Sequence, residues 1–511
     1  MKPARLLYVP AIFTILAGCA VGPNYQTPST TMPSSFAAPP ATQPATASAT
    51  TRPVDISVWW KSFGDPELDS LIDRAIAANF DLEIALTRLQ EARTAEVVVE
   101  GGALPELEAS GGAARGSGTN STKSRVSGPL NAGTNTTGLK EITQVVGFDA
   151  GWELDLWGRY RREMEAAKDD TQAAAEARNT VLITLVSDVA RAYMDARSLQ
   201  MRLKIADDNI KIEQATVEVV QERFDRGLTN ELDLALARRQ LATLQSEIAP
   251  LRDEISVAQR RLAVLLGEYP DELSVELQQP GGLPELPRRI ETGLPLDLLR
   301  RRPDIRGAER DLAANTALIG AQVADLFPNV AVTAGAGLQG QGLGRTPAGN
   351  SFIWSAGPTA YWPLLDFGAL DAVIDIQDLR THEALANYKK MIVGAVEEVE
   401  NALSAYSSEQ DRLQDLGDAL VASQRAVTLA NERYDRGLTD FLNVTDAERQ
   451  LYEIQDQYAV AQENVVVQYI AIYKSLGGGW ETYQKIPAIR KPQPAIVATV
   501  REVVAPDNPR K

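Results

Sequence analysis

The sequence predicts an α+β membrane protein made of two repeats, each with a strand pair and a hairpin of long helices. Three observations support this class. Nearly the same eight residues occur twice, as ERFDRGLT from Glu222 and as ERYDRGLT from Glu432. Two stretches, 159–225 and 369–435, contain no proline. The segments that precede these stretches alternate apolar and polar residues with a period of two, which is typical of strands.

The similarity between the two copies continues beyond the octapeptides. NELDLALARRQL follows the first and DFLNVTDAERQL the second, so Leu232 aligns with Leu442 and Arg239 with Arg449. A match of this length at one fixed offset indicates tandem duplication of a unit of about 200 residues. We therefore assign a first structural repeat to residues 57–285 and a second to residues 286–476.

Each repeat is expected to place its strand pair before its long helices. One helix is predicted over 66–100, followed by a strand pair that returns as VGFDAGWELDLWG, with Phe148 and Trp152 on its apolar face. NVAVTAGAGLQG and SFIWSAGPTAYW form the corresponding pair of the second repeat. Four strands cannot close a barrel alone, and an open sheet edge is not tolerated in lipid. In a membrane, other chains would have to complete the sheet.

The two proline-free stretches are expected to be single helices. Each would be about 100 Å long at 1.5 Å per residue, a length typical of coiled coils and helical barrels. Gly227 and Gly437 are expected to end these helices in a left-handed C-cap. Thr229 and Thr439 are expected to cap the helices that follow. The repeated octapeptides would then form two hairpin tips, remote from the strands.

Composition excludes several classes of function. The formal net charge of −17 argues against nucleic acid as a partner. One cysteine and one histidine rule out a disulfide framework and a Cys/His zinc site. A Ser-His-Asp triad would depend on His382, which lies in a helical run and is predicted to be a solvated side chain. We expect no enzymatic activity, no cofactor and no metal site.

The N-terminus resembles a bacterial lipoprotein signal. Lys2 and Arg5 precede the apolar run LLYVPAIFTILAG, which is too short to span a bilayer as a mature helix. The run leads into LAGC, which ends at Cys19, the only cysteine. The resemblance implies that residues 1–18 are a signal peptide and that Cys19 is lipidated. The alternative is an ordinary signal peptide with an incidental cysteine.

Composition also changes at both ends of the mature chain. Residues 19–56 are rich in Pro, Thr, Ala and Ser and are predicted to be a lipidated N-terminal linker. Residues 477–511 lack a helical pattern and are predicted to be an extended C-terminal tail.

Several motifs occur in one order along nearly the whole chain: GCAVGPNY at 18–25, WWKSFGDPELDSLIDRAIAAN at 59–79, LPLDLLRRRPDIRGAERDLAAN at 294–315, IGAQVADLFPNVAVTAGAG at 319–337, and two copies of RGLT. With these motifs the chain resembles the outer-membrane efflux factors of the TolC family, and within it the lipoprotein branch of the OprM and NodT type.

This resemblance implies a homotrimer. Each chain would contribute four strands to a shared 12-stranded β-barrel in contact with outer-membrane lipid. Its helices would join a 12-helix periplasmic α-barrel, with a mixed equatorial domain around mid-length. The implied function is that of a passive exit duct for drugs or other small toxic compounds. An inner-membrane RND transporter would drive export, and a periplasmic adaptor protein would join pump and duct.

The resemblance also implies two functional sites near the tips. Adaptor docking would involve the two tip turns, with residues Arg226, Gly227, Leu228, Thr229, Arg436, Gly437, Leu438 and Thr439. The resting constriction would consist of Leu442 and Asp446, with Arg449 and Tyr434 in the surrounding polar network. TolC itself has a second acidic ring at the position that Asn443 occupies here, so a single acidic ring is expected. The alternative is that Leu442 and Asp446 are ordinary coiled-coil positions.

Other interpretations compete with the efflux duct. A duct for type I protein secretion belongs to the same superfamily. A non-conducting structural lipoprotein would also have long helices, but it would not need two strand pairs. The five arginines between Arg300 and Arg310 could suggest a basic binding site; we instead expect them to pair with acidic neighbours where a helix starts at Pro303.

Overall fold

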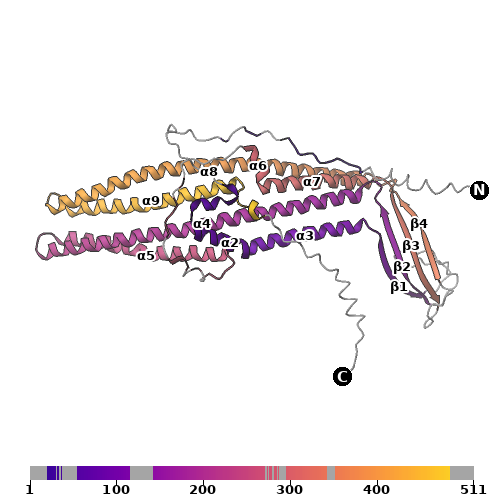
Figure 1. Ribbon diagram of the computed structural model, residues 1–511, viewed down its shortest axis with the longest axis horizontal. Helices are drawn as coiled ribbons and strands as arrows, with labels where there is room; N and C mark the ends of the chain where they lie inside the picture. The colour runs from indigo at the N-terminus through magenta and orange to yellow at the C-terminus, as the bar shows by residue number, and fades with distance from the viewer. Residues whose placement is uncertain are drawn as a thin grey trace, which may run out of the picture.

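The computed structural model describes residues 20–29, 32–33, 36, 55–115, 142–270, 273, 276–278, 281–284, 286, 295–341 and 352–483. Cys19 and the predicted signal peptide lie outside these residues, as does the tail beyond Tyr483. Figure 1 shows an elongated bundle of helices with the strands at one end and two hairpin turns at the other.

Two hairpins of long helices account for most of this length. Helices α4 (Arg159–Asp225) and α8 (Ala369–Asp435) have 67 residues each, and α5 (Glu231–Leu265) and α9 (Phe441–Ser475) have 35 each. The predicted single helices over 159–225 and 369–435 are therefore confirmed. None of the helices in the described part of the chain is long and apolar enough to cross a membrane.

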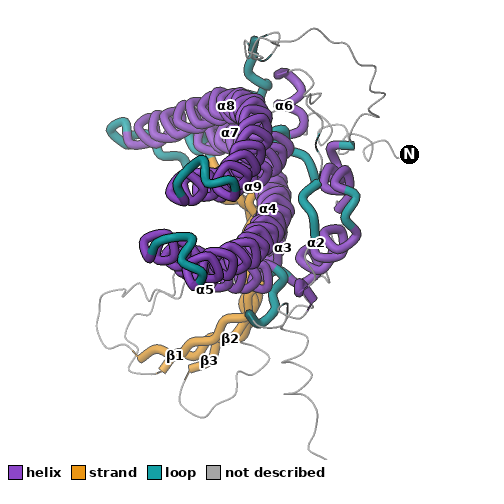
Figure 2. Tube along the Cα trace, turned by 90° about the vertical axis from the view of Figure 1, so that its left-hand side faces the viewer, coloured by secondary structure: helices purple, strands orange, loops and turns teal. Residues whose placement is uncertain are grey.

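The helices form four side-by-side columns. Helix α3 (Phe80–Gly102) packs on α4 near the strands, and α5 packs on α4 near the tips. Helix α7 (Pro303–Ala324) lies between α4 and α8 near the strands, and α9 takes the same place near the tips. Viewed from the tips, the columns form an open arc (Figure 2).

The predicted helix over 66–100 is wrong as a single element. Helix α2 (Pro66–Ala78) and α3 are separated at Asn79, whose backbone is extended at φ −68° and ψ 130°. The Asn79 side chain accepts a hydrogen bond from the Leu82 amide at 3.0 Å and donates one to the Leu265 carbonyl at 2.9 Å. Asn79 thus caps α3 and ties it to the end of α5.

The strands form one antiparallel sheet in the order β1-β2-β3-β4. They are β1 (Glu106–Arg115), β2 (Ile142–Leu154), β3 (Asn329–Gln341) and β4 (Phe352–Tyr361). The two predicted strand pairs join where Phe148 of β2 lies opposite Ala336 of β3. Phe148 and Trp354 are exposed on this sheet, whereas Asp149 is buried and accepts a hydrogen bond from Ser110 at 2.8 Å. The large apolar side chains therefore face outward.

An aromatic core holds the columns together at mid-length. The 3₁₀ helix η1 (Ile56–Phe63) inserts Trp59, which is fully buried and stacks on Tyr473 of α9 at 5.7 Å. Trp60 and Phe63 meet the Trp59 ring edge-on, each at 5.9 Å. Aromatic pairs of this kind add to the stabilisation gained from buried area.

Three of the five arginines around Pro303 pair with acidic side chains, as predicted. Arg302 is buried and binds Asp304 and Glu398, each at 2.6 Å, and the Ser475 carbonyl at 2.9 Å. Pro303 is the first residue of α7. Arg306 and Arg310 pair with acidic side chains of α4, namely Glu176 at 2.5 Å and Asp169 at 3.2 Å.

Part of the predicted N-terminal linker packs against the helices. The Val21 amide donates to the Trp157 carbonyl at 3.0 Å, and Arg162 of α4 donates to Asn24 at 2.7 Å. Gly22 has φ +87°, and a Cβ there would lie 2.3 Å from the Gly320 Cα, so no other residue fits. We name residues 20–29 the N-terminal strap.

Replacing Trp59 tests the importance of the aromatic core. We expect Trp59→Ala to lower the free energy of unfolding by about 3–5 kcal/mol, because it empties a fully buried site. A thermal unfolding scan of the purified protein in detergent measures this. Tyr269→Ala, at a position that is 80% exposed, is the control and should shift the midpoint little. Equal midpoints for both variants would contradict the assigned core.

Candidate functional site: the hairpin tips

The two helical hairpins end in turns of the same geometry. We name Arg226–Thr229 the first tip and Arg436–Thr439 the second tip. Gly227 and Gly437 have φ of +72° and +70°, as the predicted left-handed C-caps require. The amide that follows each glycine bonds back to the helix at 2.8 Å, Leu228 to Arg223 and Leu438 to Arg433. These bonds satisfy carbonyls that a helix end would otherwise leave unpaired.

The predicted caps at Thr229 and Thr439 are wrong. The next helices begin one residue later, with Asn230 and Asp440 as their N-cap residues. The Asn230 side chain accepts from the Asp233 amide at 3.0 Å, while the Thr229 hydroxyl donates to the Asp233 carboxylate. Thr439 instead accepts a hydrogen bond from the Asn443 side chain at 2.9 Å. Both threonine hydroxyls are used within the turn and are not available to cap the helix.

Each tip presents one large apolar side chain and one arginine. Leu228 and Leu438 are 67% and 62% exposed, so each turn carries an accessible apolar side chain. Arg226 lies 3.3 Å from Glu222 in an exposed ion pair. Such a pair contributes little to stability and leaves the guanidinium accessible.

A small hydrophobic cluster joins the two hairpins just behind the tips. Tyr434 is buried, and its ring lies 5.2 Å from that of Phe441. The Arg223 guanidinium of the other hairpin lies 4.5 Å above the Tyr434 ring and pairs with Asp435 at 3.2 Å. The remaining buried members of this tip cluster are Val220, Leu234, Ala237 and Val444. The cluster therefore couples the position of one tip to that of the other.

In the structure of one chain, the predicted constriction residues form two spatially separate groups. Leu442 is 59% exposed, and the Asp446 side chain is 62% exposed. Arg449 bonds Asp446 at 2.8 Å and Glu453 at 3.0 Å, so this polar group lies along one face of α9. Tyr434 is not part of it: its hydroxyl approaches Thr229 at 3.5 Å, and its ring belongs to the tip cluster.

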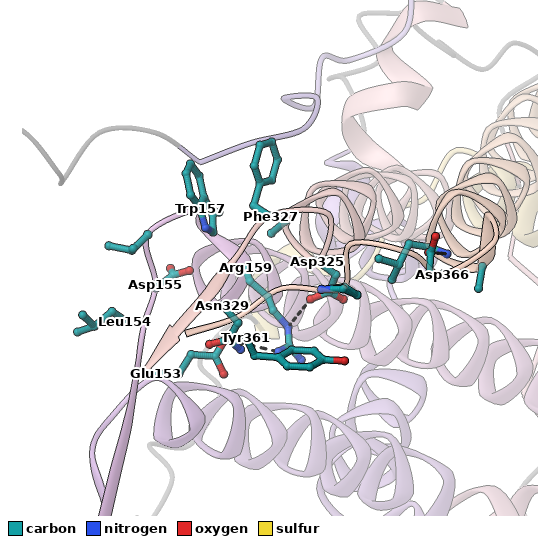
Figure 3. Close-up of a pocket in the computed structure, with 15 residues that line it drawn as sticks. Glu153, Leu154, Asp155, Trp157, Arg159, Asp325, Phe327, Asn329, Tyr361 and Asp366 are labelled. Atoms are coloured by element: carbon teal, nitrogen blue, oxygen red, sulfur yellow. Dashed lines mark hydrogen bonds and ion pairs between the residues drawn. The ribbon is translucent and has the colours of Figure 1, made fainter. Parts of the chain in front are cut away.

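A second feature, which the sequence reasoning missed, lies where the strands meet the helices. A pocket of about 400 Å³ is lined by the ends of β2 and β4 and the starts of α4 and α8 (Figure 3). Arg159 projects into it among three carboxylates, with Glu163 at 3.3 Å, Asp325 at 3.6 Å and Glu153 at 3.7 Å. The only signal in the sequence is the glycine that precedes each long helix, Gly158 and Gly368, both left-handed.

Neither site resembles a catalytic or metal centre. No group of three or more metal-ligating side chains occurs within the described residues. The pocket lining has one cation, Arg159, among several carboxylates and is therefore net negative. An outward-facing apolar sheet is a feature of a protein that contacts lipid or another apolar surface.

Comparison with known proteins decides the family. A family described as outer membrane efflux protein matches residues 71–268 and 294–478. The chain belongs to this family. Efflux proteins of the family act in the outer membrane, and solved members are channels, so this chain is an outer-membrane efflux channel.

Individual relatives agree over almost the full length. Nodulation protein T of Rhizobium leguminosarum bv. trifolii is 30% identical over 93% of this chain and 98% of its own. The cation efflux system protein CusC of Escherichia coli O6:H1 is 30% identical over 94% of this chain and 100% of its own. The structure of the outer-membrane channel OprN superposes with a TM-score of 0.79 at 34% identity, covering 90% of this chain and all of that one.

Tyr434 provides a test of the tip cluster in this efflux protein. We expect Tyr434→Ala to destabilise the tips by about 3 kcal/mol, because it removes a buried ring. Tyr434→Phe should cost less than about 1 kcal/mol, because the hydroxyl has only one long contact. Hydrogen–deuterium exchange over residues 215–240 and 430–445 measures the difference. Equal protection in both variants would show that the ring does not hold the tips.

Proposed function

We propose that this efflux channel is a homotrimeric exit duct. The observation that supports this most is the open arc: one chain supplies four strands and four helical columns, and within the described residues both arrays end in edges without a partner. Strands β1 and β4 each present one unpaired edge, and these edges must pair with something in lipid. Three chains would close a 12-stranded barrel above a 12-helix barrel. Mass photometry in mild detergent tests the trimer, which a monomer or dimer would contradict.

We propose that the chain arose by tandem duplication. The first repeat, 57–285, and the second, 286–476, have long helices of identical lengths, 67 and 35 residues. Their tips have the same sequence and nearly the same glycine φ. Trimerisation would then bring six similar hairpins around the axis, which gives each tip an equivalent role. Superposition of the two halves in an experimental structure tests this, and unrelated hairpin geometries would contradict it.

We propose that Cys19 is lipidated and anchors the strap to the membrane. The strap begins at Ala20, which lies against Gly158: a Cβ added to Gly158 would be 2.6 Å from the Ala20 Cα. Gly158 is the cap of α4, directly after β2. Acyl chains on Cys19 would therefore enter the bilayer where the strands end. The mass of the mature N-terminal peptide tests this, and an unmodified cysteine would contradict it.

We propose that the tips dock on a periplasmic adaptor that connects the duct to an inner-membrane RND transporter. The exposed Leu228 and Leu438, each beside an arginine, offer apolar and cationic contacts of the kind enriched at protein interfaces. Relatives carry names of different cargoes, with CusC named for cation efflux and TtgC of Pseudomonas putida for toluene efflux. We assign small toxic compounds as cargo; type I secretion would instead require a protein substrate.

The docking proposal predicts the effect of bulky residues at the tip glycines. No atom lies within 4 Å of a Cβ added at Gly227 or Gly437, so a larger residue fits spatially, but its positive φ is strained. We expect Gly227→Trp with Gly437→Trp to impair adaptor coupling and raise antibiotic susceptibility, at unchanged amounts of duct in the membrane. The minimum inhibitory concentrations of known pump substrates measure this. Unchanged resistance in the double variant would argue against the tips as the docking site.

We propose that Leu442 and Asp446 line the resting constriction. Both side chains are more than half exposed in one chain, which leaves them free to face a threefold axis. A ring of three leucines would exclude water by dewetting, and a ring of three aspartates would attract cations and repel anions. Arg449 would hold each Asp446 in place through its 2.8 Å contact.

Planar-bilayer recordings separate these two roles. We expect Leu442→Ala to raise single-channel conductance, because it removes the apolar plug. Asp446→Ala should mainly reduce cation selectivity, seen as a shift of reversal potential in a salt gradient. Glu432→Ala, which removes an exposed carboxylate from α8 outside the proposed ring, is the control. If both ring variants match the wild type in conductance and selectivity, the constriction lies elsewhere.

A further inference from the structure

The seam between α4 and α9 holds the two hairpins side by side. The helices run antiparallel, and polar side chains pair across them at regular intervals: Ser198 with Glu463 at 2.5 Å, Arg202 with Asp456 at 2.7 Å, and Asn209 with Gln455 at 2.8 Å. Because α4 belongs to the first hairpin and α9 to the second, these pairs resist separation of the hairpins.

One turn closer to the tips, the seam contains two acidic residues with no cation between them. Glu213 of α4 is 1% exposed, and Glu448 of α9 is 2% exposed. Tyr452, one turn from Glu448 on the same face of α9, is also buried. Both carboxylate oxygens of Glu213, one of Glu448 and the Tyr452 hydroxyl are buried without a hydrogen-bond partner. Two ionised carboxylates in such a place would be very unfavourable.

The surroundings favour the protonated acids. Burial and, after it, the like charge of Glu448 raise the pKa of Glu213 to about 8, against a smaller opposing effect of Tyr452. Burial raises the pKa of Glu448 to about 7, and the Asn431 side chain from α8 opposes this rise. From α5, Glu247 interacts with the neighbouring Arg202 and Asp456.

We propose that Glu213 and Glu448 form a proton-operated latch between the two hairpins. When both acids are protonated, each gains an O–H donor and can hydrogen-bond within the pair and to Tyr452. When the protons leave to solvent, two like charges remain buried at the seam, and separation of α4 from α9 lets water reach them. The latch acts on the seam between the tip cluster and the polar pair of Asn209 with Gln455.

The direction of the pH effect follows from proton linkage. The closed seam binds protons more tightly than the opened one, where a glutamate titrates near its ordinary value of about 4.3. The stability of the closed seam is therefore greatest at low pH and falls as pH rises towards about 8, where Glu213 loses its proton. Above that pH the stability of the closed seam no longer changes with the protonation of Glu213 and Glu448. This inference concerns the seam within one chain and does not depend on cargo or pump.

Hydrogen–deuterium exchange of the full-length protein in detergent tests the latch. After correction for intrinsic exchange, we expect residues 205–225 and 441–458 of the wild type to exchange at least about tenfold faster at pH 8.5 than at pH 6, because a closed-state pKa of about 7 for Glu448 alone shifts the opening equilibrium by about tenfold over that range. In Glu213→Gln with Glu448→Gln the corrected ratio should fall below about twofold. Each single variant should give an intermediate ratio, which keeps the test valid if the double variant folds poorly.

Glu218→Gln provides the matched control. It removes an exposed carboxylate from α4, five residues beyond Glu213, and should retain the wild-type pH response. The latch is overturned if the corrected wild-type ratio is close to one, or if the Gln variants keep the full response. Exchange reads the seam directly, so these outcomes are independent of whether the protein conducts or docks as proposed.

Discussion

Backbone hydrogen bonding in lipid is the constraint on which this architecture depends. The sheet places its large apolar residues outward and keeps Asp149 inside, so its surroundings must be apolar. In that environment an unpaired strand edge is not tolerated, yet among the described strands β1 and β4 each have one. The proposed trimer meets this requirement by supplying further strands. Because the four helical columns continue from the same strands, whatever closes the sheet also brings the open arc of helices together (Figure 2).

The elongated helical bundle also needs a rigidly packed level between the strands and the tips. Long helices joined only by short turns would splay, since each pair shares a narrow contact. The aromatic core around Trp59 and the buried Arg302 provide this rigid packing, because they connect η1, α7, α8 and α9 at one level. Towards the tips the hairpins are joined by polar pairs along the seam and, at its end, by the small tip cluster. On the proposed docking and gating roles of the tips, motion is expected there and not at the equator.

Sequence patterns predicted the long elements well and the local polar contacts poorly. The absence of proline over 159–225 and 369–435 was sufficient for the helices, and glycine in DRGLT was sufficient for their ends. The break at Asn79 was missed because apolar periodicity continues through it, and the Asn79 side chain fixes the break through its bonds with the Leu82 amide and the Leu265 carbonyl. The threonine caps failed because the helices begin one residue later, with Asn230 and Asp440 at the N-cap. The pairing of Glu213 with Glu448 depends on how α4 and α9 are aligned, which no local pattern contains.

The N-terminal strap has a consequence for the order in which the protein can assemble. Tyr25 donates to Glu309 across 284 residues of sequence, and Gly22 rests on Gly320. Part of the strap's binding surface is therefore a helix made more than half a chain later. Without α7, the strap retains its contacts with Trp157 and Arg162 but lacks those with Glu309 and Gly320, so its full docking requires the start of the second repeat. A chain truncated before α7 would keep a loose leading end, which quality-control proteases could recognise.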